Sequence, residues 1–282
     1  MLIFRHKKDI RSHLDSLIAE NKRLGLVPTM GALHKGHLAL VQKAISENEV
    51  VIVSIFVNPT QFNNQEDLSK YPNTLDEDIR QLESISNDLI VFAPKVSEMY
   101  NTSIISKDYN FDGLDNVMEG EFREGHFNGV GTIVEELLTQ IRPHNAYFGE
   151  KDFQQLQIIR KLVTLKKIPV NIIGCPIVRE GNGLAMSSRN EQLSQSLRKE
   201  AGFIYKTLQT AKIKFGTKSA SKVVEFVQNE FRNQKNLKLE YFQITEVSTL
   251  KSIRRKQKNK KYRAFIAVYA DGVRLIDNIA LN

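Results

Sequence analysis

Apolar residues between positions 24 and 173 alternate between short β-branched runs and stretches with helical spacing. Nearly every residue from Glu49 to Val57 is apolar, which is typical of a central parallel strand covered on both faces. From Gly36 to Asn48 the apolar residues recur instead with the period of a helix. The predicted strands span 24–27, 49–57, 89–93, 146–148 and 170–173, and the predicted helices span 36–48, 75–84, 131–141 and 152–165. This alternation predicts an α/β domain with a Rossmann-like, doubly wound parallel sheet.

The pattern changes after Asn190, where the alternation of strands and helices stops. The predicted helices there span 191–215 and 219–233, and the predicted strands span 237–245, 262–269 and 273–278. Asp271-Gly272 is a predicted tight turn, so the last two strands form a hairpin. These elements predict a smaller C-terminal α+β domain. We place a Rossmann-like domain at 1–176 and a smaller lid domain at 177–282.

The composition is that of a globular protein without membrane segments. Of the 282 residues, 41% are hydrophobic and 26% are charged. The longest apolar run, near Val50 to Val57, is too short to span a bilayer, and the N-terminal MLIFRHKKDI has no signal-peptide apolar region. Cys175 is the only cysteine, which excludes an intrachain disulfide and a multi-cysteine metal site. We therefore expect a cytoplasmic protein that does not bind a membrane.

The formal net charge is +8, and much of the excess lies in one run from Lys251 to Arg263. Such charge is compatible with nucleic-acid binding, with an anionic substrate, or with a solvated surface turn. Nucleic-acid surfaces usually combine basic residues with stacking aromatic rings, and only Tyr262 interrupts this run. We interpret the run as a solvated turn between two C-terminal elements and expect no nucleic-acid partner.

The stretch PTMGALHKGHLAL, from Pro28 to Leu40, places two histidines on a predicted strand–loop–helix element. His37 falls in the first helical turn with His34 just before it, while Gly31 and Gly36 relieve backbone crowding. The amides and dipole at a helix N-terminus favour an anion, and imidazoles at this spacing can donate hydrogen bonds to phosphate oxygens. A metal site is less favoured because no Asp, Glu or Cys nearby completes a ligand set. The remaining alternative is a pair of solvated histidines.

Two further polar segments carry side chains suited to phosphate. GEKDFQQ, at 149–155, follows a predicted strand and should face the same crevice, because ligands bind beyond the carboxyl ends of parallel strands. Lys151 would supply a positive charge there, and Asp152 is either a helix N-cap or a ligand for hydroxyls. GLAMSSRN, at 183–190, combines two hydroxyls with a guanidinium, as a mobile phosphate clamp would. Each segment alone is also compatible with an ordinary helix start.

Together these segments resemble a known family. HKGH at 34–37 is similar to the HxGH signature of the nucleotidyltransferase superfamily, and MSSR at 186–189 corresponds to that superfamily's second phosphate-binding loop. The resemblance to the pantoate–β-alanine ligase family is closer and covers essentially the whole chain. It rests on four stretches in that family's order and spacing, namely PTMGALHKGHLAL at 28–40, SIFVNPTQF at 54–62, GEKD at 149–152 and GLAMSSRN at 183–190.

The resemblance implies a set of site residues. Catalytic roles fall on His34, His37 and Lys151. Gln61 and Gln155 would bind pantoate, and Gln61 would also border β-alanine. The implied ATP contacts are Met30, Gly31, Ala32, Leu33, His34, Lys35, Gly36, His37, Gly149, Glu150, Lys151, Asp152, Val178, Met186, Ser187, Ser188 and Arg189.

Two other segments border the implied site. Between Tyr71 and Asp78, acidic residues match positions where the family has carboxylates near Mg²⁺. Asp78 is therefore a candidate metal contact, beside phosphates that bind most of the ion. Glu124 stands where family members commonly have proline, which changes the stiffness of its loop. Arg123 and His126 of that loop are candidate contributors to the site.

The reaction implied by the resemblance is the ATP-dependent condensation of (R)-pantoate with β-alanine. Pantoate and ATP would form pantoyl adenylate and pyrophosphate, and β-alanine would then form the amide and release AMP. ATP would act with Mg²⁺ in a homodimer that has no organic prosthetic group. Closure of the two domains at the 175–190 junction would bring residues 187–189 onto ATP. The base for the β-alanine ammonium stays open among solvent, His37 and the AMP phosphate.

Two other functions compete with this interpretation. A nucleotidylyltransferase would join AMP or CMP to a phosphorylated acceptor, but such an acceptor calls for extra Arg or Lys where Gln61 and Gln155 stand. A tRNA- or RNA-binding module would use the basic C-terminal run. The chain leaves little room for a large anticodon domain beside the catalytic core, which disfavours this alternative.

Overall fold

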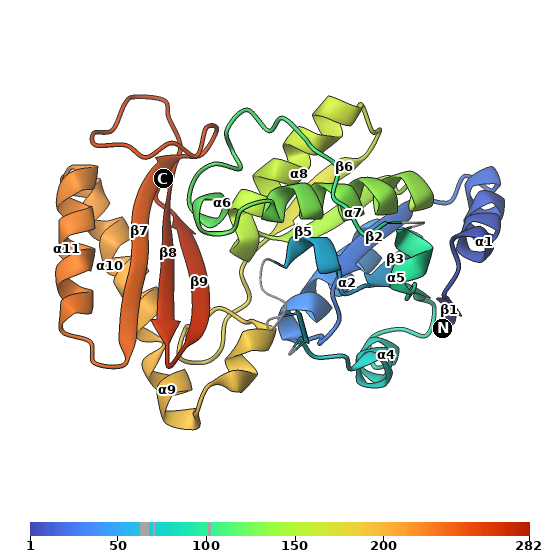
Figure 1. Cartoon of the computed structure of the whole chain (residues 1–282), viewed down its shortest axis with the longest axis horizontal. Helices are drawn as coiled ribbons and strands as arrows, with labels where there is room; N and C mark the ends of the chain where they lie inside the picture. Colours follow the sequence, from blue (N-terminus) through green and yellow to red (C-terminus); the bar gives the residue numbers. More distant parts are fainter. Residues whose placement is uncertain (63–67, 70, 101–102) are drawn as a thin grey trace. The chain divides into compact units, whose positions relative to one another are not determined.

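The computed structural model describes residues 1–62, 68–69, 71–100 and 103–282. Within them the chain divides into two compact units, shown as ribbons in Figure 1. The first unit contains Met1–Glu150 and Gln154–Pro176, and the second contains Lys151–Phe153 and Ile177–Asn282. No helix among the described residues is long and apolar enough to cross a membrane.

Among the described residues the first unit is built on a parallel sheet, as the sequence predicted, with six strands where the sequence predicted five. Its strands are β1 (Leu2–Phe4), β2 (Leu24–Thr29), β3 (Val50–Ile55), β4 (Ile90–Phe92), β5 (Asn145–Gly149) and β6 (Asn171–Cys175). Every neighbouring pair is parallel, and the strand order is β1-β4-β3-β2-β5-β6. The chain passes from the inner strand β2 to β3 on one side and later to β5 on the other. This reversal makes the sheet doubly wound.

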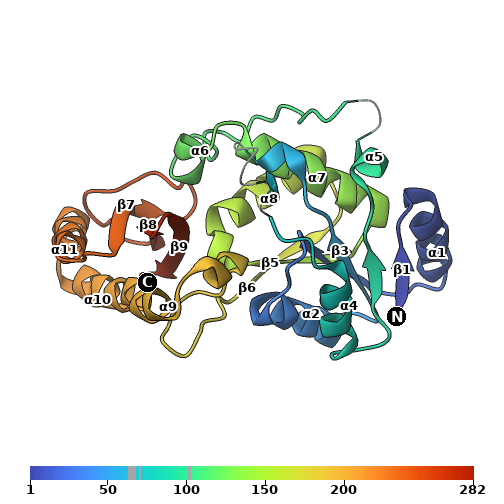
Figure 2. The same ribbon diagram turned by 60° about the horizontal axis from the view of Figure 1, so that its bottom comes forward.

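Helices cover both faces of this sheet. Among the described residues, the helices of this part of the chain are α1 (Lys7–Ala19), α2 (Lys35–Glu47), α4 (Leu75–Glu83), α5 (Val96–Met99), α6 (Glu119–Phe122), α7 (His126–Ile141) and α8 (Phe153–Lys166). On one face, Val41 of α2 and Leu82 of α4 belong to the same buried cluster as Val27 and Val53 of the strands. Figure 2 shows α7 and α8 on the opposite side of the sheet. Burial on both faces explains the nearly continuous apolar sequence of the inner strands.

Two elements at the N-terminus were not predicted, and α7 begins earlier than expected. Strand β1 has three residues at the sheet edge, and in α1 only Ile10 and Leu14 are buried, so the periodic apolar signal is weak. Helix α7 begins at His126, whereas the sequence predicted a start at 131. The first turn was missed because glycines weaken the helical pattern in the sequence. The structure needs one of them, since a Cβ on Gly129 would lie 2.3 Å from the carbonyl oxygen of Thr60.

The second unit is a three-stranded antiparallel sheet with helices packed on it. Strands β7 (Leu237–Glu246), β8 (Tyr262–Ala270) and β9 (Val273–Ala280) follow one another in the sheet. Helices α10 (Phe203–Thr217) and α11 (Ala220–Arg232) share one core with the sheet, which includes Leu208, Val227 and Ile266. The smaller C-terminal α+β fold predicted from the sequence is confirmed.

The prediction of one continuous helix over 191–215 is wrong. The structure has a 3-10 helix η3 (Ser188–Gln192), a short helix α9 (Gln195–Glu200) and then α10. The hydroxyl oxygen of Ser194 accepts a hydrogen bond from the amide of Leu197, so a new helix begins there. Gly202 separates α9 from α10, and a Cβ at this position would lie 2.6 Å from the carbonyl oxygen of Asn182.

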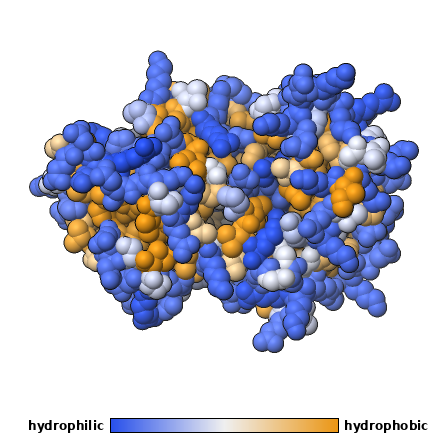
Figure 3. Space-filling model, turned by 180° about the vertical axis from the view of Figure 1, so that it is seen from behind, coloured by the Kyte–Doolittle hydropathy of each residue, from blue (hydrophilic) through white to orange (hydrophobic). Residues whose placement is uncertain are grey.

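Most of the basic run, from Lys251 to Lys261, lies between β7 and β8, whereas its last residue, Arg263, is buried in β8. Its side chains from Arg254 to Lys261 are exposed, as expected for a solvated turn, and hydrophilic residues also cover most of the face shown in Figure 3. Lys256 nevertheless has a structural role, because its Nζ donates to the carbonyl oxygens of Phe215 at 2.5 Å and Gly216 at 3.0 Å. A cation at the C-terminal end of a helix, here α10, stabilises that helix.

We predict that Lys256→Ser lowers the free energy of unfolding by about 1 kcal/mol, because two carbonyl groups at the end of α10 lose their donor. Lys258→Ser, a matched exposed lysine of the same run, should change it by less than about 0.5 kcal/mol. Urea denaturation followed by circular dichroism measures both variants. Equal effects of the two substitutions would contradict the capping role.

Candidate functional site

The predicted site segments of the first unit lie at the carboxyl ends of neighbouring strands. The loop Met30–His34 leaves β2, the 3-10 helix η1 (Pro59–Gln61) follows β3, and Gly149 ends β5. Because β2 lies between β3 and β5, these segments are neighbours at the point where the strand order reverses. Open parallel sheets bind their ligands at this position.

A buried carboxylate holds the loop that follows β2. The two carboxylate oxygens of Asp78, in the first turn of α4, accept hydrogen bonds from the amides of Ala32 at 3.0 Å and Leu33 at 2.7 Å. The loop needs this support because Gly31 and Ala32 have φ angles of 83° and 50°. Asp78 is 1% exposed. Burial raises the pKa of its carboxyl group, against the opposing effect of the hydrogen bonds from Leu33 and Ala32.

The start of α2 brings His34 and His37 together. The Nδ1 atom of His34 accepts from the amide of Gly36 at 3.1 Å, and Nδ1 of His37 accepts from the amide of His34 at 3.3 Å. The two rings stack with their centroids 4.0 Å apart. Since each Nδ1 acts as an acceptor, a neutral ring carries its proton on Nε2. Each imidazole therefore has an Nε2–H donor at the positive end of a 13-residue helix.

The other predicted ATP contacts of the first unit differ in exposure. Lys35 is exposed, whereas Met30, Ala32, Gly36, Gly149 and Glu150 are half-buried. Leu33 packs in the buried cluster with α2, and its amide donates to Asp78. Leu33 therefore supports the loop through its backbone.

Gln61 lies against the same loop. Its Nε2 is 2.8 Å from the sulfur of Met30, and its Oε1 accepts from Nδ2 of Asn58 at 3.1 Å. The backbone carbonyl of Gln61 accepts from Nδ1 of His126 at 2.8 Å and from a guanidinium nitrogen of Arg123 at 3.2 Å. The structure thus brings Arg123 and His126 to Gln61, where they hold its main chain.

Asn58 is a central residue that the sequence analysis did not single out. It is 1% exposed, and its Nδ2 also donates to the carbonyl oxygen of Gly129 at 3.1 Å. Its Oδ1 accepts from the hydroxyl groups of Tyr100 at 2.5 Å and Thr60 at 3.1 Å. These bonds tie η1 to α7 and to the end of α5. The available signal was the Asn-Pro dipeptide, which marks a turn after a strand.

The first turn of α8 contains two glutamines with different environments. Gln155, the predicted pantoate contact, is half-buried. Gln154 is 3% exposed, and its Nε2 donates to the carbonyl oxygens of Leu114 at 2.8 Å and Val117 at 2.7 Å. Its Oε1 accepts from the amide of Glu119 at 3.1 Å. Gln154 therefore orders the segment that leads into α6, a role that sequence reasoning missed.

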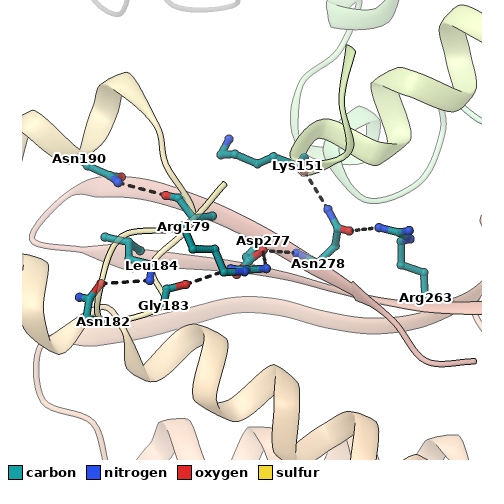
Figure 4. Close-up of polar contacts among 10 residues, drawn as sticks. Lys151, Arg179, Asn182, Gly183, Leu184, Asn190, Arg263, Asp277 and Asn278 are labelled. Carbon is teal, nitrogen blue, oxygen red and sulfur yellow. Dashed lines mark hydrogen bonds and ion pairs between the residues drawn. The ribbon is translucent and has the colours of Figure 1, made fainter. Parts of the chain in front are cut away.

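A small hairpin of the second unit carries the predicted phosphate-binding loop, and part of it is drawn in Figure 4. The amide of Met186 donates to the carbonyl oxygen of Val178 at 3.0 Å, and Arg179 pairs with Ala185 in an antiparallel bridge. Gly183 makes the turn with a φ of 92°, a conformation that favours glycine. The predicted contacts Val178 and Met186 are therefore direct neighbours.

The residues Ser187, Ser188 and Arg189 follow this hairpin and are half-buried. The hydroxyl oxygen of Ser187 accepts a hydrogen bond from the amide of Arg189 at 3.3 Å and caps η3. The segment therefore begins a 3-10 helix, and its role as a phosphate loop stays a prediction.

Glu180 fixes the base of the hairpin. Its Oε1 accepts from Nδ2 of Asn190 at 2.8 Å, and its carboxylate pairs with the guanidinium of Arg198 at 2.9 Å. Burial alone would raise the pKa of Glu180, but the hydrogen bonds from Arg198 and Asn190 outweigh it and hold the pKa below its usual value. The carboxylate is thus favoured in the folded protein.

Lys151 lies in the 3-10 helix η2 (Glu150–Asp152) between β5 and α8, and belongs to the second unit. Its Nζ is 3.7 Å from Oδ1 of Asp152, and its side chain is 20% exposed. Its backbone carbonyl accepts from Nδ2 of Asn278 at 2.9 Å, as Figure 4 shows. Strand β9 therefore holds the main chain at Lys151.

The described residues contain no group of three or more His, Cys, Asp or Glu side chains placed to hold a metal ion. Both oxygens of Asp78 already accept hydrogen bonds from backbone amides. Mg²⁺ prefers oxygen ligands and in nucleotide sites takes several of them from phosphates and water. These residues therefore fit a Mg²⁺ ion that arrives with ATP better than one held by a carboxylate cluster.

Comparison with known proteins assigns the motifs to one family. The family model for pantoate-beta-alanine ligase matches residues 2–280. A pantothenate synthetase of Christiangramia forsetii is 57% identical over 282 residues, which covers 100% of both chains. Another, from Flavobacterium psychrophilum, is 52% identical over 281 residues and also covers 100% of both chains.

Solved structures agree with this assignment. The pantothenate synthetase of Thermus thermophilus matches with a TM-score of 0.91 at 36% identity, covering 100% of this chain and 99% of that one. The pantoate-beta-alanine ligase of Francisella tularensis, complexed with βγ ATP and β-alanine, matches with a TM-score of 0.82 at 38% identity, covering 100% and 98%. A doubly wound sheet with an HxGH loop at its switch point defines a nucleotide-dependent α/β enzyme. This chain belongs to the pantoate–β-alanine ligase family, whose members form an amide bond.

We predict that Asp78→Ala lowers the free energy of unfolding by about 2 kcal/mol, because a buried amide and a half-buried one lose their acceptor. It should also raise the KM for ATP. Asp76→Ala, an exposed acidic residue in the same helical turn, should change the stability by at most about 0.5 kcal/mol. Urea denaturation and steady-state kinetics test both variants. If Asp78→Ala changed the Mg²⁺ requirement at unaltered stability, the carboxylate would be a metal ligand instead.

Proposed function

We propose that this chain condenses pantoate with β-alanine in an ATP-dependent reaction that passes through pantoyl adenylate. The pantoate carboxylate attacks the α-phosphorus of ATP, and pyrophosphate leaves. The β-alanine amine then attacks the acyl carbon of the adenylate, the amide forms and AMP leaves. The Francisella tularensis relative is complexed with βγ ATP and β-alanine, which supports ATP and β-alanine as substrates of this chain.

The observation that carries this proposal is the stacked His34–His37 pair at the N-terminus of α2. A carboxylate must approach an anionic triphosphate, so neutralisation of charge and alignment are the main requirements. The Nδ1 atoms of both rings accept hydrogen bonds from backbone amides, so a neutral ring carries its proton on Nε2, from which it would donate to a phosphate oxygen. Because the capping bonds fix the rings before ATP binds, little reorganisation is needed in the transition state.

We assign the remaining charge stabilisation to residues from both units. The Lys151 ammonium and the Ser187 and Ser188 hydroxyls would bind phosphate oxygens, and Mg²⁺ would enter with ATP. The other proposed ATP contacts are Met30, Gly31, Ala32, Leu33, Lys35, Gly36, Gly149, Glu150, Asp152, Val178, Met186 and Arg189. We further propose that the enzyme is a cytoplasmic homodimer and uses no organic prosthetic group.

The amide side chains of Gln61 and Gln155 are the proposed pantoate ligands, and Gln61 also borders β-alanine. An amide binds hydroxyl and carboxylate groups without adding a group that titrates near neutral pH. The contact of Gln61 with the sulfur of Met30, on the loop that leads to the histidines, supports this role. Arg123 and His126 support it by fixing its carbonyl group.

A pyrophosphate-release assay tests the proposed function. With ATP and pantoate alone, the purified protein should release pyrophosphate in an amount comparable to the enzyme present. Addition of β-alanine should give continuous turnover with equal amounts of AMP and amide. Pyrophosphate release that needs a phosphorylated acceptor in place of pantoate would support a nucleotidylyltransferase and refute the proposal.

We predict that His37→Ala and Lys151→Ala each remove at least ~2.7 kcal/mol of transition-state stabilisation, roughly a hundredfold in rate, as is typical of a lost preorganised donor. His13→Ala and Lys8→Ala, matched substitutions on α1, should retain full turnover. Circular dichroism checks that all four variants are folded. Near-wild-type turnover in either site variant would refute its assignment.

Gln61→Ala and Gln155→Ala should each cost ~1–3 kcal/mol in pantoate use, because part of the acid then loses its hydrogen-bond partners. The KM for pantoate should rise, while ATP affinity measured by calorimetry without pantoate should stay nearly constant. Loss of ATP binding at unchanged pantoate affinity would mean that the glutamines belong to the nucleotide site.

A further inference from the structure

Two consecutive residues of β9, Asp277 and Asn278, are polar and almost fully buried, at 4% and 1% exposure. Successive side chains of a strand point to opposite faces, so these two reach opposite sides of the sheet. The register agrees, because Asp277 lies beside Ile266 of the core shared with α10 and α11, whereas Asn278 lies beside Phe265. Figure 4 shows the contacts that each of them makes.

Asp277 is connected to the phosphate-binding hairpin. Its carboxylate forms a bidentate ion pair with the guanidinium of Arg179, with N–O distances of 2.6 and 3.0 Å. The same guanidinium donates to the carbonyl oxygen of Gly183 at 3.0 Å and stacks 3.6 Å from the ring centre of Tyr205. Arg179 is therefore fixed from three directions, and with it the turn that precedes residues 186–189.

Asn278 is connected to Lys151. Its Nδ2 donates to the backbone carbonyl of Lys151 at 2.9 Å, and its Oδ1 accepts from the guanidinium of Arg263. That guanidinium lies 3.7 Å from the ring centre of Phe153, two residues after Lys151. Phe153 in turn packs 6.0 Å from Phe265, measured between ring centroids. The η2 turn is thus held on β8 and β9 by both polar and aromatic contacts.

Net stability does not explain why such groups are buried. Desolvation offsets most of the attraction within a buried ion pair, and apolar side chains of similar volume often stabilise a protein as well or better. Buried polar groups with directed bonds do, however, select one geometry among several packed ones. Here the selected geometry fixes two segments that are far apart in sequence and are both proposed to bind ATP.

We propose that Asp277 and Asn278 are positioning residues for ATP: Asp277, through Arg179, sets the loop of residues 186–189, and Asn278 sets Lys151. This inference rests on the proposed function, which gives both segments their role as phosphate ligands. Neither β9 residue needs to touch the nucleotide. Each acts through the main chain or the side chain of the residue that it holds.

The decisive variant is Asn278→Asp, which keeps the acceptor for Arg263 but replaces the donor to the Lys151 carbonyl by an oxygen. Misplacement of a phosphate ligand by a fraction of an ångström should raise the KM and the Kd for ATP about tenfold, with the KM for pantoate changed less than about twofold. Asp277→Asn should have a similar effect through the hairpin. Should the added charge unfold the first variant, Asn278→Ala gives the same comparison.

A double-mutant cycle separates positioning from general structural damage. In the Lys151→Ala background, Asn278→Asp should weaken ATP binding by less than about twofold, since the group that it positions is gone. The control is Glu240→Gln, which breaks another ion pair of β9, between Glu240 and Arg274 at 2.6 Å. It should lower the melting temperature and leave the Kd for ATP unchanged.

The outcomes distinguish this inference from the proposed function. If Lys151→Ala bound and used ATP like the wild type, the proposed role of Lys151 would fail. If Lys151→Ala were impaired but Asn278→Asp bound ATP normally, only the positioning role would be refuted. The same holds if the losses of ATP affinity caused by Lys151→Ala and Asn278→Asp were additive in the double mutant. An equal rise in the KM for ATP and for pantoate would likewise mark a structural role.

Discussion

One buried carboxylate, Asp78, accepts hydrogen bonds from the amides of Ala32 and Leu33, and much of the site depends on these two bonds. They hold a loop whose Gly31 and Ala32 adopt positive φ angles that an unsupported chain rarely keeps. The end of that loop is His34, the cap of α2, so the geometry of the histidine pair follows from it. The carboxylate thereby fixes the conformation of the loop between the end of β2 and the start of α2.

The chemistry proposed for the site would use neutral hydrogen-bond donors around anions. Stacked imidazoles with engaged Nδ1 atoms and amide side chains such as Gln61 offer hydrogen bonds without a permanent charge. Lys151 adds a compact positive charge. These groups would suit an acyl adenylate under the proposed function, because the triphosphate must be neutralised during attack and AMP released afterwards.

The sequence predicted the parts of the fold whose signal is local. The apolar runs of β2 and β3 and the HKGH motif at 34–37 could be recognised because periodicity, glycines and helix starts lie within a few residues of one another. Strand β1 and helix α1 were missed because most of their surface faces outward. The supporting residues Asn58, Gln154 and Asn278 look like ordinary surface residues in the sequence, since each finds its hydrogen-bond partners far along the chain. For Asp78 the resemblance suggested a metal contact, and its hydrogen bonds to the amides of Ala32 and Leu33 could not be predicted because these residues also lie far along the chain.

The assignment of Lys151–Phe153 to the second unit has a consequence for how such a gene can be cut or recombined. A fragment ending at Pro176 would carry Phe153 and the Lys151 carbonyl away from Arg263 and Asn278, and a fragment starting at Ile177 would leave those two side chains without them. The units are discontinuous along the sequence. In a chimera that joins two relatives at 176, residues 151–153 would come from one parent and strands β8 and β9 from the other. The contacts between them would therefore form only if the two parents have compatible side chains at these positions.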